Sequence, residues 1–332
     1  MTGKLKTITA LLIISSLLCG CSPVNRACSA SGMYFDTVVS IDLYGASSAD
    51  ADTILDQCMS ICEHYQDLFD KNTITSDIAK INSASGSPVH VDHDTAMLTS
   101  RALEYSNMSE GRFDITIAPV TALWDFHEDI GKIPDPSDLK SACKLVNFKN
   151  VSVDTVNDTV TVSGGSSIEL GAAAKGYIAD RIADHLQSCD ISGAIINMGG
   201  DIRLVGEKPD GSPFVIGVND PFNENSVTCA LALCDMAVAT SGTYERCFTI
   251  DGRKYHHIID TSTGYPVRTD IESVTVITKS ALDADCLCTV AILYGSKEAM
   301  KLIENSADTE AVFILDDGSM IMSSGAYAYI RQ

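Results

Sequence analysis

The chain has 332 residues, with 44 acidic and 23 basic side chains, so its formal net charge at pH 7 is -21. This charge argues against general nucleic-acid binding, which relies on a basic surface. A hydrophobic content of 45% suffices for a sizeable core, and the length suits two ordinary domains or one large one. A polyanionic substrate would need a metal ion or local lysines to offset the repulsion.

The N-terminus is typical of a targeting segment. Two lysines precede an apolar run over residues 8–18 that is too short for an ordinary membrane-spanning helix and fits a signal peptide. The sequence LCGC at residues 18–21 then resembles the lipobox of bacterial lipoproteins. That resemblance implies removal of residues 1–20, lipidation of Cys21 and a polar tether over residues 21–32. The alternative is a plain secretory signal cut nearby, and either one places the folded part outside the cytoplasm.

Twelve cysteines in an exported chain would suggest disulfides. Their placement argues otherwise, because Cys58 and Cys62 fall on the apolar stripe of one expected helix. Cys286 and Cys288 fill small positions in another, and a free buried cysteine behaves as a small hydrophobic residue. The sequence has no CxxC pair and no Cys/His spacing typical of zinc sites.

In the first half of the chain, apolar stripes with helical spacing predict helices and β-rich alternation predicts strands. In chain order these are a strand at 33–45, helices at 48–69, 77–81 and 95–108, a short extended piece leading into a helix near Pro119, a loop with a short helix at 131–147, and a hairpin at 151–164.

The second half interleaves strands and helices more evenly. We expect a short strand ending at Leu170, a helix with Tyr177, Ile178, Ile182 and Leu186 on one face, two strands around the glycines at 199–200, strands at 214–220, 226–235, 236–242, 254–260 and 271–278, helices at 280–293 and 297–304, and closing strands within 311–330. The sequence shows no internal repeat and no clear linker. It therefore predicts one α/β or α+β domain over residues 33–332, compact and two-lobed, with mixed sheets flanked by helices.

Five stretches carry residues suited to chemistry. In ELGAAAKGY, the small residues at 171–174 start a helix, and helix N-termini bind phosphate through free N–H groups. Lys175 adds a positive charge there, although tight packing with a solvated Lys175 is an equal alternative.

In SALDADCLCTVAIL, Asp285 and Thr289 share one helix face and could offer oxygens to a hard cation such as Mg²⁺. The alternative is a first-turn dipole residue and a threonine bonded to its own helix.

The other three stretches are weaker signals. Gly199 and Gly200 in NMGGDIRL permit a turn with positive φ or a close ligand approach, but an ordinary hairpin is the simpler interpretation. His257 and Asp260 bracket two isoleucines on an expected strand, where a histidine could act as a base or bind phosphate. A solvated strand residue is the commoner case. Asp114 in GRFDIT lies just before a helix, and N-capping would explain it.

The order and wording of these stretches together resemble one family. FDTVVSIDLYG, SDIAKIN, GRFDITIAPVTALWDF, ELGAAAKGYIAD, NMGGDIRLVG, HHIIDTSTGYPV and SVTVITKSALDADCLCTVAILYG are similar to segments of the FAD:protein FMN transferases, the ApbE family. The resemblance covers roughly residues 33–330. Its most specific pieces are GAAAKG, HIID..TG and SA..AD...T.

The resemblance implies a Mg²⁺-dependent reaction in which a threonine hydroxyl of a target protein attacks the FMN-side phosphorus of FAD and AMP leaves. It implies a metal site formed by Asp285, Thr289 and the carbonyl of Ala172. A divalent ion would let an acidic protein bind a pyrophosphate. His257 and Asp260 match the family's HxxD element beside the reacting phosphate, as base or charge stabiliser.

The resemblance also implies contacts to FAD from residues spread along the chain: Met33, Asn72, Phe113, Asp114, Glu169, Lys175, Gly200 and His257. Two of these depart from the family pattern. Glu169 stands where the family often has aspartate, and Asn72 lies near a position that is aromatic in many members. A small polar residue there could admit water as the nucleophile.

The sequence therefore predicts a lipid-anchored FMN transferase on the extracytoplasmic face of the cell membrane. Its expected partners are FAD and exported redox proteins that carry a Ser/Thr-containing flavinylation motif. Two alternatives stay open, an FAD pyrophosphatase that yields FMN and AMP and a non-catalytic FAD-binding lipoprotein. The second needs no working metal site, so Asp285, Thr289 and Lys175 count against it.

Overall fold

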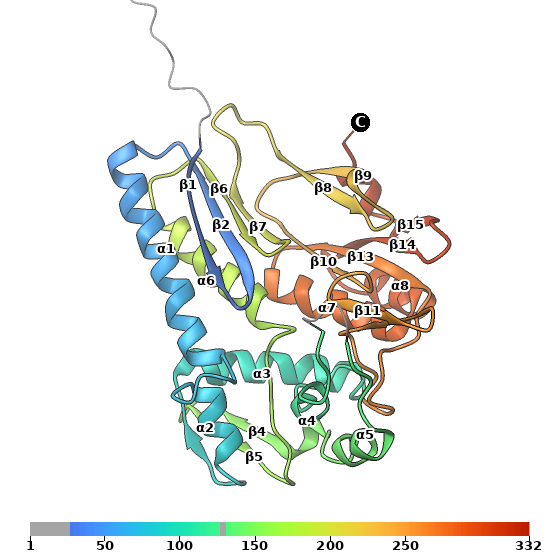
Figure 1. The fold of residues 1–332 in the computed structure, drawn as a ribbon. Coiled ribbons are helices and arrows are strands. Elements are labelled where there is room, and N and C mark those ends of the chain that lie inside the picture. Colours follow the sequence, from blue (N-terminus) through green and yellow to red (C-terminus); the bar gives the residue numbers. More distant parts are fainter. Residues whose placement is uncertain (1–26, 127–130, 332) are drawn as a thin grey trace, which may run out of the picture.

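The computed structural model describes residues 27–126 and 131–331 (Figure 1). The predicted signal segment and Cys21 lie outside the described residues. The largest element is an eight-stranded sheet in which neighbouring strands run antiparallel. Across the sheet the strands are β1 (Cys28–Tyr34), β2 (Thr37–Tyr44), β6 (Gly193–Met198), β7 (Asp201–Gly206), β10 (Ala237–Gly242), β13 (Ile271–Thr278), β14 (Glu310–Leu315) and β15 (Met320–Met322).

Four helices pack on one face of this sheet (Figure 1). They are α1 (Ser48–Phe69), α6 (Ala174–Gln187), α7 (Ala281–Tyr294) and α8 (Ser296–Glu304). The opposite face is covered by the hairpin of β8 (Phe214–Asp220) and β9 (Asn223–Leu233), whose apolar side chains pack on those of the sheet. Among the described helices, none is long and apolar enough to span a membrane.

A second lobe lies below the sheet in the view of Figure 1. It contains α2 (Asp77–Ser83), α3 (His93–Met108), α4 (Ala118–Thr121), α5 (Pro136–Cys143), and a small sheet of β3 (Val89–His90), β5 (Thr159–Val162) and β4 (Val151–Asp154). The hairpin of β11 (Cys247–Ile250) and β12 (Arg253–His256) contacts this lobe through an aromatic cluster around Trp124. The expected α+β architecture with two packed lobes is confirmed.

Helix α7 is the most buried of the described helices. Its residues are apolar nearly all round, and its side chains are buried from Ala281 to Leu293 except at Asp283 and Thr289. All residues of the preceding strand β13 are buried as well. A helix packed on every side is apolar all round, which makes the two acidic residues of α7 informative.

Some expected boundaries were wrong. The strand expected at 33–45 is a hairpin of β1 and β2, because Phe35 and Asp36 take positive φ angles of 53° and 56° in a two-residue turn. Strand β1 begins at Cys28, inside the segment for which we predict a tether. Residues 326–329 form a 3-10 helix in place of a closing strand, and no regular strand precedes α6 at Leu170.

All cysteines in the described part of the chain are free thiols, and Cys58, Cys62, Cys286 and Cys288 are buried. Burial raises the pKa of Cys58 and of Cys62 to about 12, so both stay protonated. They behave as small core residues, as their positions in the sequence indicate.

Candidate active site

The first turns of α6 and α7 lie in close contact. A Cβ atom on Gly176 would lie 2.2 Å from the carbonyl oxygen of Ala281, so only glycine allows the two backbones to approach this closely. The Gly176 N–H donates to Oδ2 of Asp285 at 3.2 Å. Gly176 therefore lets α6 pack closely on α7, and this packing brings Lys175 beside α7.

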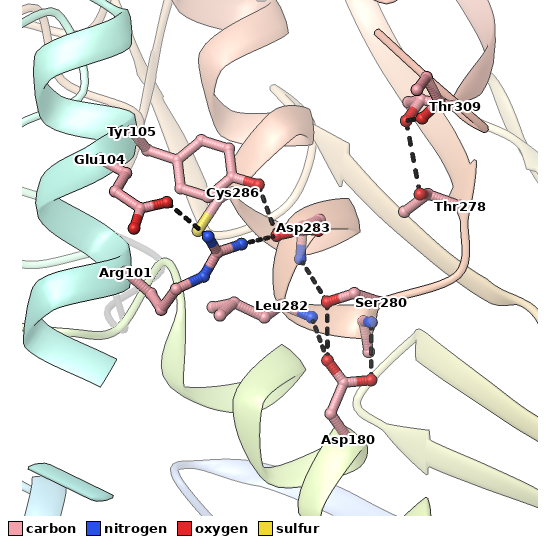
Figure 2. Close-up of polar contacts among 12 residues, drawn as sticks. Arg101, Glu104, Tyr105, Asp180, Thr278, Ser280, Leu282, Asp283, Cys286 and Thr309 are labelled. Atoms are coloured by element: carbon pink, nitrogen blue, oxygen red, sulfur yellow. Dashed lines mark hydrogen bonds and ion pairs between the residues drawn. The ribbon is translucent and has the colours of Figure 1, made fainter. Parts of the chain in front are cut away.

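The start of α7 is fixed from two sides, as Figure 2 shows. From α6, the Asp180 carboxylate accepts hydrogen bonds from the Ser280 hydroxyl and from the N–H groups of Ala281 and Leu282. From α3, Arg101 and Tyr105 both donate to Oδ1 of Asp283, at 2.8 and 2.6 Å. The Asp180 contacts satisfy N–H groups that the first turn of a helix leaves free. Together with the contacts to Asp283 they fix where Asp285 points.

Lys175, Asp201 and Asp285 form a buried charge cluster. The Lys175 ammonium lies 2.8 Å from Oδ2 of Asp201 and 3.1 Å from both carboxylate oxygens of Asp285. Asp201 and Asp285 are each 4% exposed, whereas the Lys175 side chain keeps 24% of its surface accessible. Buried carboxylates require a charged partner, and here one ammonium serves two of them.

The pKa values of Lys175 and Asp201 are shifted in this cluster, in which two carboxylates share one ammonium. Desolvation acts against protonation of Lys175, but the charges of Asp201 and Asp285 outweigh it and raise its pKa. Burial raises the pKa of Asp201 to about 6, the Asp285 charge adds to this effect and Lys175 opposes it. Sequence reasoning missed Asp201. The available signal was an acid placed directly after the Gly199-Gly200 turn, at the start of a strand.

The three residues expected to bind a metal lie at this junction. Thr289 is half-buried one turn beyond Asp285, and the carbonyl oxygen of Ala172 accepts a 3.6 Å contact from the Cys286 thiol next to Asp285. Among the described residues, no three His, Cys, Asp or Glu side chains cluster in a way that could hold a metal. The expected set contains one carboxylate, one carbonyl and one hydroxyl, which are the oxygen donors that Mg²⁺ prefers. The Lys175 ammonium already lies beside Asp285, which shows that this carboxylate can hold a cation. The three oxygen donors therefore fit a metal cation.

His257 lies just beyond the end of β12, not on a strand as expected. Its Nδ1 atom is buried and has no hydrogen-bond partner. Burial lowers the pKa of His257 to about 4, and the positive charge of Arg246 acts in the same direction. The imidazole is therefore neutral at pH 7, with a free ring nitrogen.

Asp260 has a different environment. Its Oδ1 accepts hydrogen bonds from the Ser262 N–H and hydroxyl, at 2.9 and 2.7 Å, and no hydrogen bond joins the described side chains of Asp260 and His257. Asp260 thus shapes the DTSTG turn. Thr261 in that turn donates to the carbonyl oxygen of Gly111 at 2.9 Å, which joins it to the GRFDIT segment.

Sequence reasoning also missed Glu245, because no motif or spacing in the YERCF segment marks this acid as a functional residue. It lies exposed at the edge of the charge cluster, yet the protein atoms around its carboxyl desolvate it and raise its pKa to about 7. The charges of Asp201 and Asp285 act in the same direction. Several groups with displaced pKa values in one place are typical of functional sites.

The residues expected to contact FAD fall into three groups. Met33 and Gly200 are brought together: Met33 is 66% exposed and pairs with Val38, whose carbonyl oxygen accepts from the Gly199 N–H. A Cβ atom on Gly200 would have no atom within 4 Å, so the space above this turn is open. The exposed Met33–Val38 pair and the glycine turn form one surface next to Asp201.

Asn72 and Glu169 form the second group. A carboxylate oxygen of Glu169 accepts from the Lys71 ammonium and from the Thr121 hydroxyl. Asn72 follows Lys71 directly and is exposed, with its N–H bonded to Oδ1 of Asp70. The Lys71–Glu169 ion pair thus holds the Asn72 turn against the segment that leads to Lys175.

Phe113 and Asp114 form the third group, and here the structure excludes the N-capping alternative for Asp114. Asp114 does not cap α4. Its carboxylate accepts from the N–H and hydroxyl of Thr116 and from the N–H of Phe148, at 2.6 to 2.9 Å. Phe113 is 5% exposed and packs edge-on against Tyr105. Asp114 also lines a cavity of about 370 Å³ together with Glu110 and residues of the DTSTG turn.

Comparisons with known proteins identify the family of this chain. The model of the ApbE family matches residues 35–313, a range that begins just after Met33. An FAD:protein FMN transferase of Klebsiella pneumoniae (strain 342) is 31% identical over 303 residues, covering 90% of this chain and 93% of its own. One from Treponema pallidum is 28% identical over 341 residues, covering 96% and 94%.

Solved structures show the same fold. The ApbE protein of Thermotoga maritima superimposes with a TM-score of 0.85 at 32% identity, covering 92% of this chain and 100% of its own. The flavin transferase ApbE of Vibrio cholerae gives a TM-score of 0.81 at 28% identity, with the same coverage. The chain described here belongs to the ApbE family.

Proposed function

We propose that this chain is an FAD:protein FMN transferase, which moves the FMN part of FAD onto a threonine hydroxyl of a target protein and releases AMP. The observation that carries the proposal is the buried cluster of Lys175, Asp201 and Asp285, with further oxygen donors on Ala172 and Thr289. Relatives that carry the transferase name match nearly the whole chain. With a divalent ion bound, the cluster would supply the positive charge that a protein of net charge -21 needs for a pyrophosphate substrate.

In the proposed reaction, the threonine oxygen forms a bond to the FMN-side phosphorus and the bond from that phosphorus to the bridging oxygen breaks. AMP leaves with the bridging oxygen. The hydroxyl proton needs an acceptor, and His257 suits this role because its imidazole is neutral at pH 7 and its Nδ1 is free. Asp260 would act through the turn that it shapes, as a positioning residue.

Ala172, Asp285 and Thr289 would hold a Mg²⁺ ion in this proposal. When bound, the ion supplies positive charge that stabilises the charge developing on phosphate oxygens. Lys175 would contact the nucleotide, and the exposed Met33–Val38 pair beside Gly200 offers an apolar surface for the flavin ring. Glu169, Asn72, Phe113 and Asp114 complete the proposed FAD contacts.

We further propose that the protein acts at the extracytoplasmic face of the cell membrane. The support is the sequence alone: a signal-like segment over residues 1–20 that ends in a lipobox-like LCGC, with Cys21 as the lipid-bearing residue. The residues between Cys21 and the start of β1 at Cys28 would then lead from the membrane into the folded domain. The acceptors in this location would be exported redox proteins with a Ser/Thr-containing flavinylation motif.

The test uses the full chain in detergent with FAD, Mg²⁺ and a flavin-acceptor domain. Mass spectrometry follows the acceptor and chromatography follows FMN and AMP. The proposal predicts an acceptor threonine heavier by the mass of FMN less one water, and an equal amount of AMP. Asp285→Ala should abolish the reaction, whereas Asp308→Ala, which removes an exposed acid paired with Lys279, should leave it unchanged. Full activity in Asp285→Ala would contradict the assigned metal site.

A second function is favoured by one observation. Asn72 is exposed and polar at a position near which an aromatic residue is expected, so water has access beside the proposed nucleotide site. An FAD pyrophosphatase would give free FMN and AMP in the same experiment, with the acceptor unmodified. Intact FAD after incubation with Mg²⁺ would instead support a non-catalytic FAD carrier.

A further inference from the structure

Lys175 lies where a cation on Asp285 would lie. Its ammonium is 3.1 Å from Oδ1 and 3.1 Å from Oδ2 of Asp285, so it lies across both carboxylate oxygens. The Asp285 side chain is 5% exposed, and its Oδ2 also accepts the Gly176 N–H. Little of the carboxylate is left for a second cation while Lys175 holds this position.

Asp201 gives the same ammonium a second partner. The Lys175 Nζ to Asp201 Oδ2 distance of 2.8 Å is shorter than either distance to Asp285. The Asp201 Oδ2 atom is buried, and its charge is compensated mainly by the ion pair with Lys175, with a smaller contribution from a backbone hydrogen bond of Thr240 to the carboxyl. One ammonium among two buried carboxylates leaves the cluster with a net charge of -1.

Metal and ammonium cannot occupy the same oxygens. A divalent ion on Asp285 would repel a positive charge held within about 4 Å of it. The Lys175 ammonium can remain paired when a metal ion binds, because its contact with Asp201 can persist after its contacts with Asp285 are lost. A quarter of the Lys175 side chain faces solvent, which leaves room for this shift.

We propose that Lys175 competes with the divalent metal for Asp285, and that Asp201 is the partner that keeps the ammonium when the metal binds. This inference rests on the proposed function for the metal site and adds Asp201 to it. The metal ion then binds to Asp285 by displacing the Lys175 ammonium. An anionic nucleotide phosphate would give Lys175 another partner, so the affinity for metal would rise when FAD is present.

The test measures Mn²⁺ binding to the full chain in detergent without FAD, from the electron paramagnetic resonance signal of free Mn²⁺. Lys175→Met should lower the Kd for Mn²⁺ by about tenfold, because a nearby like charge is removed. Lys175→Arg keeps the charge and should stay close to wild type. Asp201→Asn should raise the Kd, because Lys175 is then left with Asp285 alone.

Lys254→Met is the matched control. It removes a lysine from another ion pair, with Glu272, and changes the net charge equally, so its Kd should remain within about twofold of wild type. Thermal melting shows which variants are folded. Equal or weaker Mn²⁺ binding by folded Lys175→Met overturns the exchange, whereas wild-type binding that Asp285→Asn does not reduce overturns the metal site itself.

Discussion

The Asp180 carboxylate on α6 accepts a 2.8 Å hydrogen bond from the hydroxyl of Ser280, the N-cap residue of α7 (Figure 2). The same carboxylate accepts from the N–H groups of Ala281 and Leu282. Lys175 lies in the first turn of α6 and Asp285 lies in α7, so their separation depends on a contact that involves neither of them. The charge cluster is positioned by the way in which the two helices are joined.

Replacing Asp180 should therefore cost stability and disturb the site. Asp180→Ala removes three hydrogen bonds and the ion pair with Arg203, and it leaves two N–H groups without their partner. We therefore expect the free energy of unfolding to fall by about 2–4 kcal/mol. Urea unfolding followed by circular dichroism measures this. Asp184→Ala lies on the same helix in an exposed ion pair with Arg181 and should cost at most about 1 kcal/mol. Similar losses in the two variants would contradict the special role of Asp180.

Gly176 tests the close approach of the two helices. In Gly176→Ala the new Cβ would lie 2.2 Å from the Ala281 carbonyl oxygen, a backbone atom, so α6 and α7 must move apart. We expect a loss of about 1–3 kcal/mol in the free energy of unfolding and weaker Mn²⁺ binding. Gly171→Ala, where a Cβ meets no atom within 4 Å, is the control. Wild-type stability and Mn²⁺ affinity in Gly176→Ala would show that the close contact of α6 and α7 does not position the charge cluster.

Two histidines should titrate in opposite directions from the ordinary value. Burial lowers the pKa of His257 to about 4, whereas a hydrogen bond from exposed His93 to Asp158 raises the pKa of His93. Between about pH 4 and 6.5 the unfolded chain binds more protons at His257 than the folded chain does. This group therefore makes the free energy of unfolding increase with pH across that window, and its full contribution is present above pH 6.5.

Proton NMR of the histidine ring signals between pH 3.5 and 8 measures both pKa values, with His257→Gln and His93→Gln to assign the signals. The expected order is His257 well below 6.5 and His93 above it. A His257 pKa at or above 6.5 would remove the argument that its imidazole is neutral and ready to accept a proton at pH 7.

In our proposal, Asn72 influences whether the FMN group is transferred to the acceptor threonine or to water. Asn72→Tyr should shield the site and raise the ratio of flavinylated acceptor to free FMN, by severalfold if water enters there. The acceptor assay by mass spectrometry gives this ratio. Ile74→Tyr is the control, because Ile74 is 88% exposed in the same turn and an aromatic residue there adds similar bulk. An unchanged ratio in Asn72→Tyr would mean that water does not enter at this position.

Local patterns were enough for most helices and strands. The apolar stripe of α6, with Tyr177, Ile178, Ile182 and Leu186 buried on one face, follows from helical periodicity. The hairpin of β4 and β5 turns at Asp158 with a positive φ, as its Asn-Asp sequence indicates. The pair of Asp285 and Thr289 on one helix face is likewise a matter of spacing alone.

Tertiary structure decided which of these residues meet. Asp201 and Lys175 are far from Asp285 in sequence, and no local spacing shows that one ammonium lies between two carboxylates. The role of Asp114 changed for the same reason, since its partner Phe148 belongs to a distant turn. A buried charge takes the partner that the packing of other elements brings to it. Local sequence patterns thus determined most of the elements and the candidate residues other than Asp201 and Glu245, and only the packing of α6 on α7 and β7 decided how their charges pair.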